Sequence, residues 1–129
     1  GKGGIGKSTV SADISFHIAK GGKKVLHVGC DPKSDSTLLL TRHAKPTPVA
    51  STLLKNRGKP FDLTQAVHVG VHGVECIESG GPEPGVGCGG WGIARVLSIL
   101  EENRIFDRDY ECILFDVLGD VVCGGFAMP

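Results

Sequence analysis

The chain has 129 residues, and its 14 basic and 14 acidic residues give a formal net charge of zero at pH 7. A chain without excess positive charge is poorly suited to bind nucleic acid or an anionic membrane surface, and no apolar run approaches the ~18 residues that cross a membrane. Five cysteines, an odd number spread along the sequence, do not form a dense disulfide framework and favour a reducing cytoplasm.

The first nine residues, GKGGIGKST, fit the spacing G-x-x-x-x-G-K-[ST] of a Walker A phosphate-binding loop. The glycines keep side chains away, so that backbone N–H groups can surround phosphate oxygens. We expect Lys7 to neutralise the β- and γ-phosphates and Ser8 to bind Mg²⁺, while the following helix directs its positive end at the same anion. An ordinary glycine-rich turn is the alternative. The expected nucleotide contacts are Gly1, Lys2, Gly3, Gly4, Ile5, Gly6, Lys7, Ser8 and Thr9.

The two ends of the sequence differ from those of a complete P-loop domain. Such a loop normally follows a buried strand, but nothing precedes Gly1, and the sequence stops at Met128 and Pro129. We therefore expect residues 1–129 to be part of a single P-loop domain that lacks its first strand and its C-terminal portion.

Helical and extended patterns alternate along the chain. In chain order they predict a helix at 7–20, a strand at 23–30, short helical pieces at 38–40, 49–56 and 62–67, a strand at 74–79, a helix at 91–103 and a strand at 111–116. In the first helix the expected apolar stripe is Val10, Ile14 and Ile18, with Ala12 and Ala19 nearby. This alternation predicts an α/β fold, a doubly wound and mostly parallel sheet with helices on both faces. Ligands of such sheets bind in the loops that follow the strands.

Acidic residues lie in two of these loops. Asp116 ends the last predicted strand and forms the pattern D-x-x-G with Gly119. In P-loop proteins such an aspartate holds the hydration shell of Mg²⁺, and the glycine N–H can reach the γ-phosphate. Asp31, Lys33 and Asp35 follow the first predicted strand, where a carboxylate could orient water or magnesium. For these three residues a solvated charged loop is an equal alternative.

Two of the five cysteines lie in glycine-rich loops. Cys88 and Cys123 are each followed by two glycines, which allow the backbone to approach a cluster and to offer N–H groups to its sulfurs. A [4Fe–4S] cluster needs four thiolates, so a twofold-symmetric dimer could supply two from each chain. Zinc or free thiols are the alternative. Cys30, Cys76 and Cys112 lie in apolar strands and are expected to behave as small buried hydrophobes.

The position of Cys123 suggests how nucleotide and cluster would communicate. It follows Asp116 by seven residues and Asp120 by three, on the loop that would sense the γ-phosphate. Loss of that phosphate would move the loop and with it the cluster, as in other nucleotide switches.

Four segments in this order, GKGGIGKST, GCDPKSDST, ESGGPEPGVGC and DVLGDVVCGGFAMP, closely resemble the nitrogenase iron protein family, also called dinitrogenase reductase. The resemblance covers essentially the whole sequence, which is similar to about the N-terminal half of that protein. It implies a P-loop ATPase of the deviant Walker A type, a homodimer that bridges one [4Fe–4S] cluster. Such a protein takes electrons from a donor such as a ferredoxin or flavodoxin. It passes them singly to a larger catalytic partner as MgATP is hydrolysed, in nitrogen fixation.

The resemblance also implies roles for individual residues. Cys88 and Cys123 match the cluster ligands, Lys7 and Ser8 match the phosphate and magnesium contacts, and Asp116 matches the Walker B position.

Three further residues match catalytic positions of the family. Asp31 matches the first-switch carboxylate, and Asp120 matches the carboxylate that positions the attacking water. Lys2 matches the signature lysine that reaches the nucleotide of the partner chain, so it would act in trans, much as an arginine finger does.

One position departs from the family pattern. Nitrogenase iron proteins typically continue GCAGRG at the first cluster cysteine, whereas this sequence has GCGGWG with Trp91 at the arginine position, the arginine that can be ADP-ribosylated. That stretch is more similar to the related reductases of protochlorophyllide and chlorophyllide, while ESGGPEPGVGC and CGGFAMP are more similar to the nitrogenase branch.

A positioning or partitioning ATPase is the alternative from another functional class. Such a protein shares the P-loop with a lysine like Lys2 but carries out no redox chemistry. It would have no use for Cys88 and Cys123, which favours the reductase.

Overall fold

The computed structural model describes residues 6–31, 33–55, 62–80 and 89–117. In chain order the elements are α1 (Lys7–Lys20), β1 (Val25–Cys30), α2 (Val49–Lys55), β2 (His68–Val69), β3 (Glu75–Glu78), α3 (Gly89–Glu102) and β4 (Cys112–Val117). Single 3-10 turns lie at Leu63–Gln65, Val71–Gly73 and Ile105–Asp107.

The strands form one four-stranded sheet in the order β2-β3-β1-β4. β1 pairs in parallel with β3 on one side and with β4 on the other, and the two-residue β2 pairs antiparallel with β3. The prediction of an α/β fold with a mostly parallel sheet is therefore confirmed.

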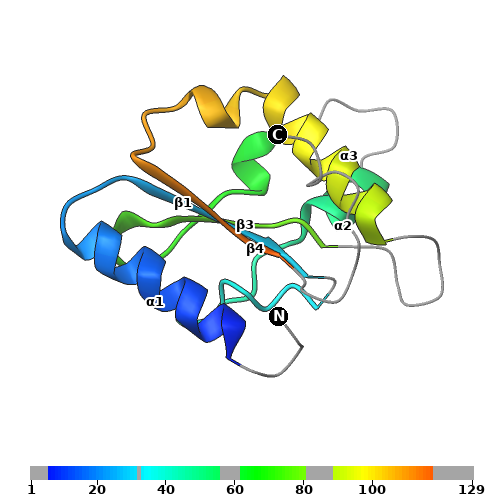
Figure 1. Ribbon diagram of the computed structural model, residues 1–129. Coiled ribbons are helices and arrows are strands. Elements are labelled where there is room, and N and C mark those ends of the chain that lie inside the picture. The colour runs from blue at the N-terminus through cyan, green and yellow to red at the C-terminus, as the bar shows by residue number, and fades with distance from the viewer. Residues whose placement is uncertain (1–5, 32, 56–61, 81–88, 118–129) are drawn as a thin grey trace.

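Helices cover both faces of this sheet (Figure 1). α1 lies on one face, and α2 and α3 lie on the other, as the predicted doubly wound arrangement requires. All six residues of β1 are buried because this central strand is covered on both sides. Leu26 and Val28 pack with Val96 and Leu100 of α3, whereas Val25 packs into the cluster on the α1 side. Strands buried on both faces read as continuous apolar runs, which explains why β1 could be predicted.

The predicted apolar stripe of α1 is wrong at Val10 and Ile14, which are 59% and 45% exposed. Ile18 packs against the cluster on the α1 side, and Ala12 and Ala19 are buried together with Ser15. Small side chains on that face allow the helix to lie close to the sheet, and Ser15 meets a polar group of β1 there.

Several boundaries differ from those expected. Residues 38–40 form turns rather than a helical piece, and within 62–67 the structure has a single 3-10 turn. β4 continues to Val117, so Asp116 lies inside the strand rather than at its last position. α3 begins at Gly89, earlier than the predicted start at residue 91.

Candidate functional site

The carboxyl ends of β3, β1 and β4 meet at one edge of the sheet because the three strands are parallel. Gly29 of β1 lies opposite Glu78 of β3 on one side and opposite Asp116 of β4 on the other. A Cβ atom on Gly29 would lie 2.2 Å from Glu78 Oε2 and 2.7 Å from the Cβ of Ser36. The glycine therefore leaves the space in which both carboxyl groups and the loop after β1 come together.

Asp116 and Lys7 form an ion pair at this edge, although 109 positions separate them in the chain. Lys7 Nζ lies 3.3 Å from Asp116 Oδ1 and also donates to the carbonyl oxygen of Val117. The carboxylate side chain is 1% exposed, whereas that of Lys7 is 29% exposed. The structure thus brings together the lysine of the predicted phosphate loop and the aspartate of the predicted D-x-x-G pattern.

The electrostatics of Asp116 favour its ionised form. Burial by itself would raise the pKa of this carboxyl, but the hydrogen bonds from Ser36 and Ser8 and the charge of Lys7 together lower its pKa below the ordinary value. Asp116 is therefore an anion at neutral pH, held in place by three donors from two other parts of the chain.

The loop after β1 is attached to Asp116 through Ser36. Ser36 Oγ donates to Asp116 Oδ2 at 2.6 Å, and the same hydroxyl lies 2.8 Å from His27 Nε2. His27 Nδ1 lies 2.8 Å from the hydroxyl of Ser15 on α1. Ser15, His27 and Ser36 are fully or almost fully buried, so these contacts form one internal polar chain from α1 to β4.

The same loop is attached to β3 through Thr37. Both the backbone N–H and the hydroxyl of Thr37 donate to Glu78 Oε1, at 2.7 and 2.8 Å. Burial raises the pKa of Glu78 to about 7, and the neighbouring charges of Asp35 and Asp116 add to this effect while the Thr37 hydrogen bonds oppose it. Glu78 Oε2 is buried and has no hydrogen-bond partner among the described residues.

The predicted first-switch residues lie in the same loop but are less enclosed. Asp31 is half-buried, and its Oδ1 accepts a hydrogen bond from the backbone N–H of Lys33 at 2.9 Å. Asp35 is half-buried and Lys33 is exposed. In this arrangement Asp31 shapes its own turn, and its predicted role toward water or magnesium stays a prediction.

The start of α1 has the features of an anion site. Gly6 caps the helix in the left-handed conformation, with φ 84°, and the first turn contains no acidic residue that would compensate the positive end of the helix. Ser8 is half-buried and hydrogen-bonds Asp116, whereas Thr9 is exposed. The other predicted nucleotide contacts in the loop, residues 1–5, lie outside the described residues, and so do Gly119 and Asp120.

The oxygen groups at this edge suit a hard cation such as Mg²⁺. Asp116 Oδ1 is buried and, apart from its ion pair with Lys7, has no hydrogen-bond partner among the described residues, and the Ser8 hydroxyl hydrogen-bonds the same carboxylate. An anionic carboxylate beside a hydroxyl is the donor set that Mg²⁺ prefers. The residues present therefore fit the predicted magnesium site.

The predicted cluster ligands, Cys88 and Cys123, lie outside the described residues. As expected, Cys30 and Cys76 are buried, and Cys112 is half-buried. Burial raises the pKa of Cys76 to about 12, with Glu78 and Glu75 adding to the effect, so its thiol is protonated. Within the part of the chain that the structure describes, no group of three or more His, Cys, Asp or Glu side chains could hold a metal ion.

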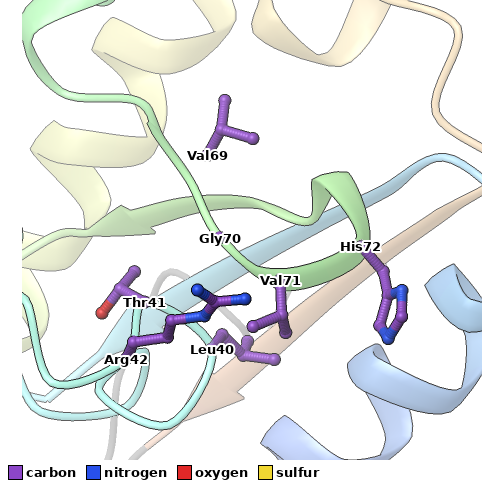
Figure 2. A pocket seen from close by; sticks show the side chains of 7 residues that line it. All are labelled: Leu40, Thr41, Arg42, Val69, Gly70, Val71 and His72. Carbon is purple, nitrogen blue, oxygen red and sulfur yellow. The ribbon is translucent and has the colours of Figure 1, made fainter.

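A separate pocket of about 330 Å³ lies at the β2 edge of the sheet (Figure 2). The side chains of Arg42 and His72 do not converge: Arg42 extends toward Gly70, while His72 points toward α1 and packs on Phe16, with ring centroids 4.9 Å apart. We therefore assign the pocket no binding role. Among the described helices, none has the length and apolar character needed to span a bilayer.

Motif spacing predicts roles for Lys7, Ser8 and Asp116 but for none of the polar residues that the structure places around them. His27 lies outside the four family segments, and Glu78 begins one of them without a predicted role. Glu78 lies at the end of an apolar strand, as Asp116 does in the predicted strand at 111–116. That position could have indicated Glu78 as a candidate site residue.

Comparison with solved structures shows the fold. Cobyrinic acid a,c-diamide synthase from Mycobacterium smegmatis, with a bound ATP analog and magnesium, is 21% identical with a TM-score of 0.57, over 89% of this chain and 47% of that one. The BceF tyrosine kinase domain is 23% identical with a TM-score of 0.56, over 89% and 43%. Protein DIP2308 from Corynebacterium diphtheriae is 21% identical with a TM-score of 0.52, over 89% and 50%. This chain thus spans about half the length of each of these structures.

A family model covers the whole sequence. The model described as 4Fe-4S iron sulfur cluster binding proteins, NifH/frxC family, matches residues 1–129. This match agrees with the resemblance carried by the four sequence segments and with the meeting of Lys7 and Asp116 in the structure. The chain belongs to the NifH/frxC family of 4Fe-4S iron–sulfur cluster binding proteins.

Proposed function

We propose that the protein is the ATP-dependent reductase component of a nitrogenase. In this proposal a homodimer bridges one [4Fe–4S] cluster and passes single electrons to a larger catalytic partner, coupled to hydrolysis of MgATP. The observation that carries the proposal is the contact between Lys7 and Asp116, because it joins the two halves of a nucleotide site at the edge of the sheet where such folds bind ligands.

The triphosphate would bind at the start of α1. The uncompensated helix end and the Lys7 ammonium supply positive charge, and the partial exposure of Lys7 allows it to turn from Asp116 to a phosphate oxygen. Ser8 and Asp116 would hold Mg²⁺, which when bound neutralises charge on the phosphates. Asp116 is suited to this because its donors keep it ionised.

Three residues outside this contact complete the proposed nucleotide chemistry. Asp120 would position the attacking water, Lys2 would contact the nucleotide of the partner chain, and Asp31 would act as the first-switch carboxylate. The support for these roles is their match to the family motifs.

The cluster would be held by Cys88 and Cys123 from each of the two chains. The family description supports a 4Fe-4S cluster, and the described cysteines are buried or half-buried in strands, which leaves the two loop cysteines as the ligands of choice. When bound, the cluster stores and releases one electron at a time. A ferredoxin or flavodoxin in the cytoplasm would reload it.

A second candidate function is electron delivery in tetrapyrrole biosynthesis. The run GCGGWG, with Trp91 where the nitrogenase branch has arginine, favours this branch. The two candidates share the nucleotide and cluster chemistry and differ in the protein that accepts the electron.

The test uses full-length protein purified without oxygen. We expect about four iron atoms per dimer, a brown colour, and MgATP hydrolysis that accompanies electron transfer to the catalytic component of nitrogenase. Transfer only to the catalytic component of a protochlorophyllide or chlorophyllide reductase would favour the second candidate. A colourless protein that hydrolyses ATP fully would identify a positioning ATPase instead and contradict the proposal.

A further inference from the structure

A buried histidine lies behind the proposed magnesium site. His27 is at the middle of β1 with 0% of its surface exposed, and both of its ring nitrogens have partners at 2.8 Å, Ser15 on α1 and Ser36 in the loop after β1. Ser36 in turn contacts Asp116 at 2.6 Å. Burying an imidazole in an apolar strand costs free energy unless its nitrogens are paired, so the pairing of both gives the residue a definite orientation.

The hydrogen bonds that join Ser15, His27, Ser36 and Asp116 all run in one direction. Ser36 has a single hydroxyl hydrogen and gives it to the ionised Asp116, so its oxygen can only accept from His27 Nε2–H. Burial lowers the pKa of His27 to about 4 against the opposing charge of Asp116, so the ring is neutral and carries one proton, on Nε2. Nδ1 then accepts from the hydroxyl of Ser15. In this row of hydrogen bonds every donor therefore points from α1 toward Asp116.

We propose that His27 is a positioning residue for Asp116, and that it acts by fixing the orientation of the Ser36 hydroxyl. Asp116 Oδ2 accepts a hydrogen bond from that hydroxyl, while Oδ1 faces Lys7. Without the N–H of His27, the Ser36 oxygen would lose its buried partner, and the hydroxyl would be free to rotate away from the carboxylate. This inference rests on the proposed hydrolysis of ATP, because the benefit of a fixed Asp116 is a correctly held magnesium ion.

The hydrogen bonds through His27 also link α1, the helix that begins at the phosphate loop, to the loop that follows β1. Ser15 lies eight residues after Lys7 on the same helix, and the two residues reach Asp116 by different routes, Lys7 directly and Ser15 through His27 and Ser36. A shift of α1 relative to β1 would disturb both routes together. His27 therefore keeps the first turn of α1 and the Asp116 carboxylate in one geometry.

Three variants of the full-length protein test this inference. His27→Leu has similar bulk and no N–H, whereas His27→Gln can place an amide N–H near the position of Nε2. His17→Leu, on the exposed face of α1, is the matched control for loss of a histidine. The measurements are kcat and KM for ATP hydrolysis with the electron-accepting partner, together with ¹⁵N NMR of the imidazoles in the nucleotide-free parent.

We expect His27→Leu to lower kcat about tenfold, as for loss of one hydrogen bond of ordinary strength, with a smaller change in KM because Lys7 and the helix end still bind the phosphates. His27→Gln should recover kcat to within about threefold of the parent. His17→Leu should leave both constants unchanged. The NMR spectrum should show His27 protonated on Nε2 alone at pH 7.

The possible failures have separate meanings. An unchanged kcat in His27→Leu, or equal losses in the Leu and Gln variants, would overturn the inference. If His27→Leu does not fold, the NMR spectrum still decides, since protonation on Nδ1 would reverse the chain and overturn it. If the parent itself does not hydrolyse ATP, the proposed function fails and this inference fails with it.

Discussion

Replacement of Glu78 by glutamine should stabilise the protein in a pH-dependent manner. Burial raises the pKa of Glu78 from its ordinary 4.5 to about 7, so between these values the folded protein keeps a proton that the unfolded chain has released. The free energy of unfolding of the parent therefore falls as the pH rises from about 4.5 to about 7. At 1.36 kcal/mol for each pKa unit, the total loss is roughly 3 kcal/mol.

Glutamine has the shape of the protonated acid and does not ionise. Its carbonyl oxygen can accept both hydrogen bonds from Thr37 that now go to Glu78 Oε1. We expect Glu78→Gln to exceed the parent in stability by roughly 3 kcal/mol at pH 8 and by less than about 1 kcal/mol at pH 5. Such a gain is large beside the 5–15 kcal/mol that typically separates folded and unfolded states.

The assay is urea unfolding of cluster-free, nucleotide-free full-length protein at pH 5 and pH 8. The dependence of the unfolding free energy on urea should have the same slope in both proteins, so that the midpoints report stability. Glu101→Gln, at an exposed position of α3, is the matched control and should change little at either pH. A gain of equal size at both pH values, or a loss at pH 8, would show that Glu78 is ionised in the folded protein and would refute the reasoning.

Three further predictions concern the site and its packing. Lys7→Ala should weaken MgATP binding at least about tenfold in calorimetry, because the phosphates lose their principal cation; equal affinity would contradict the assigned role. Cys88→Ser and Cys123→Ser should each lose the iron of the cluster, while Cys76→Ser should keep it; normal iron content in either of the first two would exclude the bridging arrangement. Gly29→Ala should lower the unfolding free energy by roughly 1 to 3 kcal/mol, because the added Cβ would lie 2.2 Å from the Glu78 carboxyl. An unchanged urea midpoint would contradict the close packing of this edge of the sheet.

The parts of the fold that could be predicted depend on local patterns. The strand at Val25–Cys30 is apolar except for His27 because helices cover both of its faces. Lys7 and Asp116 belong to motifs whose residues are close together in the sequence, so each could be assigned before the structure brought them to 3.3 Å.

The parts that were missed depend on contacts between distant residues. Glu78 is held by Thr37, 41 positions away, and Ser36 meets Asp116, 80 positions away. No local pattern distinguishes such a buried polar residue from one at the surface, since its partners are set by strand order and register. For a related reason, the sequence does not place Ser15 on the buried face of α1: Ser15 is polar and is buried because it meets His27 of β1.

The attachment of the loop after β1 has a consequence for its movement. Ser36 and Thr37 are adjacent, yet they donate to carboxyl groups on opposite sides of β1, Asp116 on β4 and Glu78 on β3. If the loop left the sheet, Glu78 would lose both of its Thr37 hydrogen bonds in the same step as Asp116 loses Ser36, one of its three donors. The buried Glu78 carboxyl would then be left unpaired, at a cost of about 1–3 kcal/mol. Release of the loop from the sheet therefore changes the hydrogen bonding of Asp116 and Glu78 at the same time. A ligand that binds Asp116 more tightly when Ser36 is in contact with it will also hold the loop against the sheet, because it favours the state in which that contact exists.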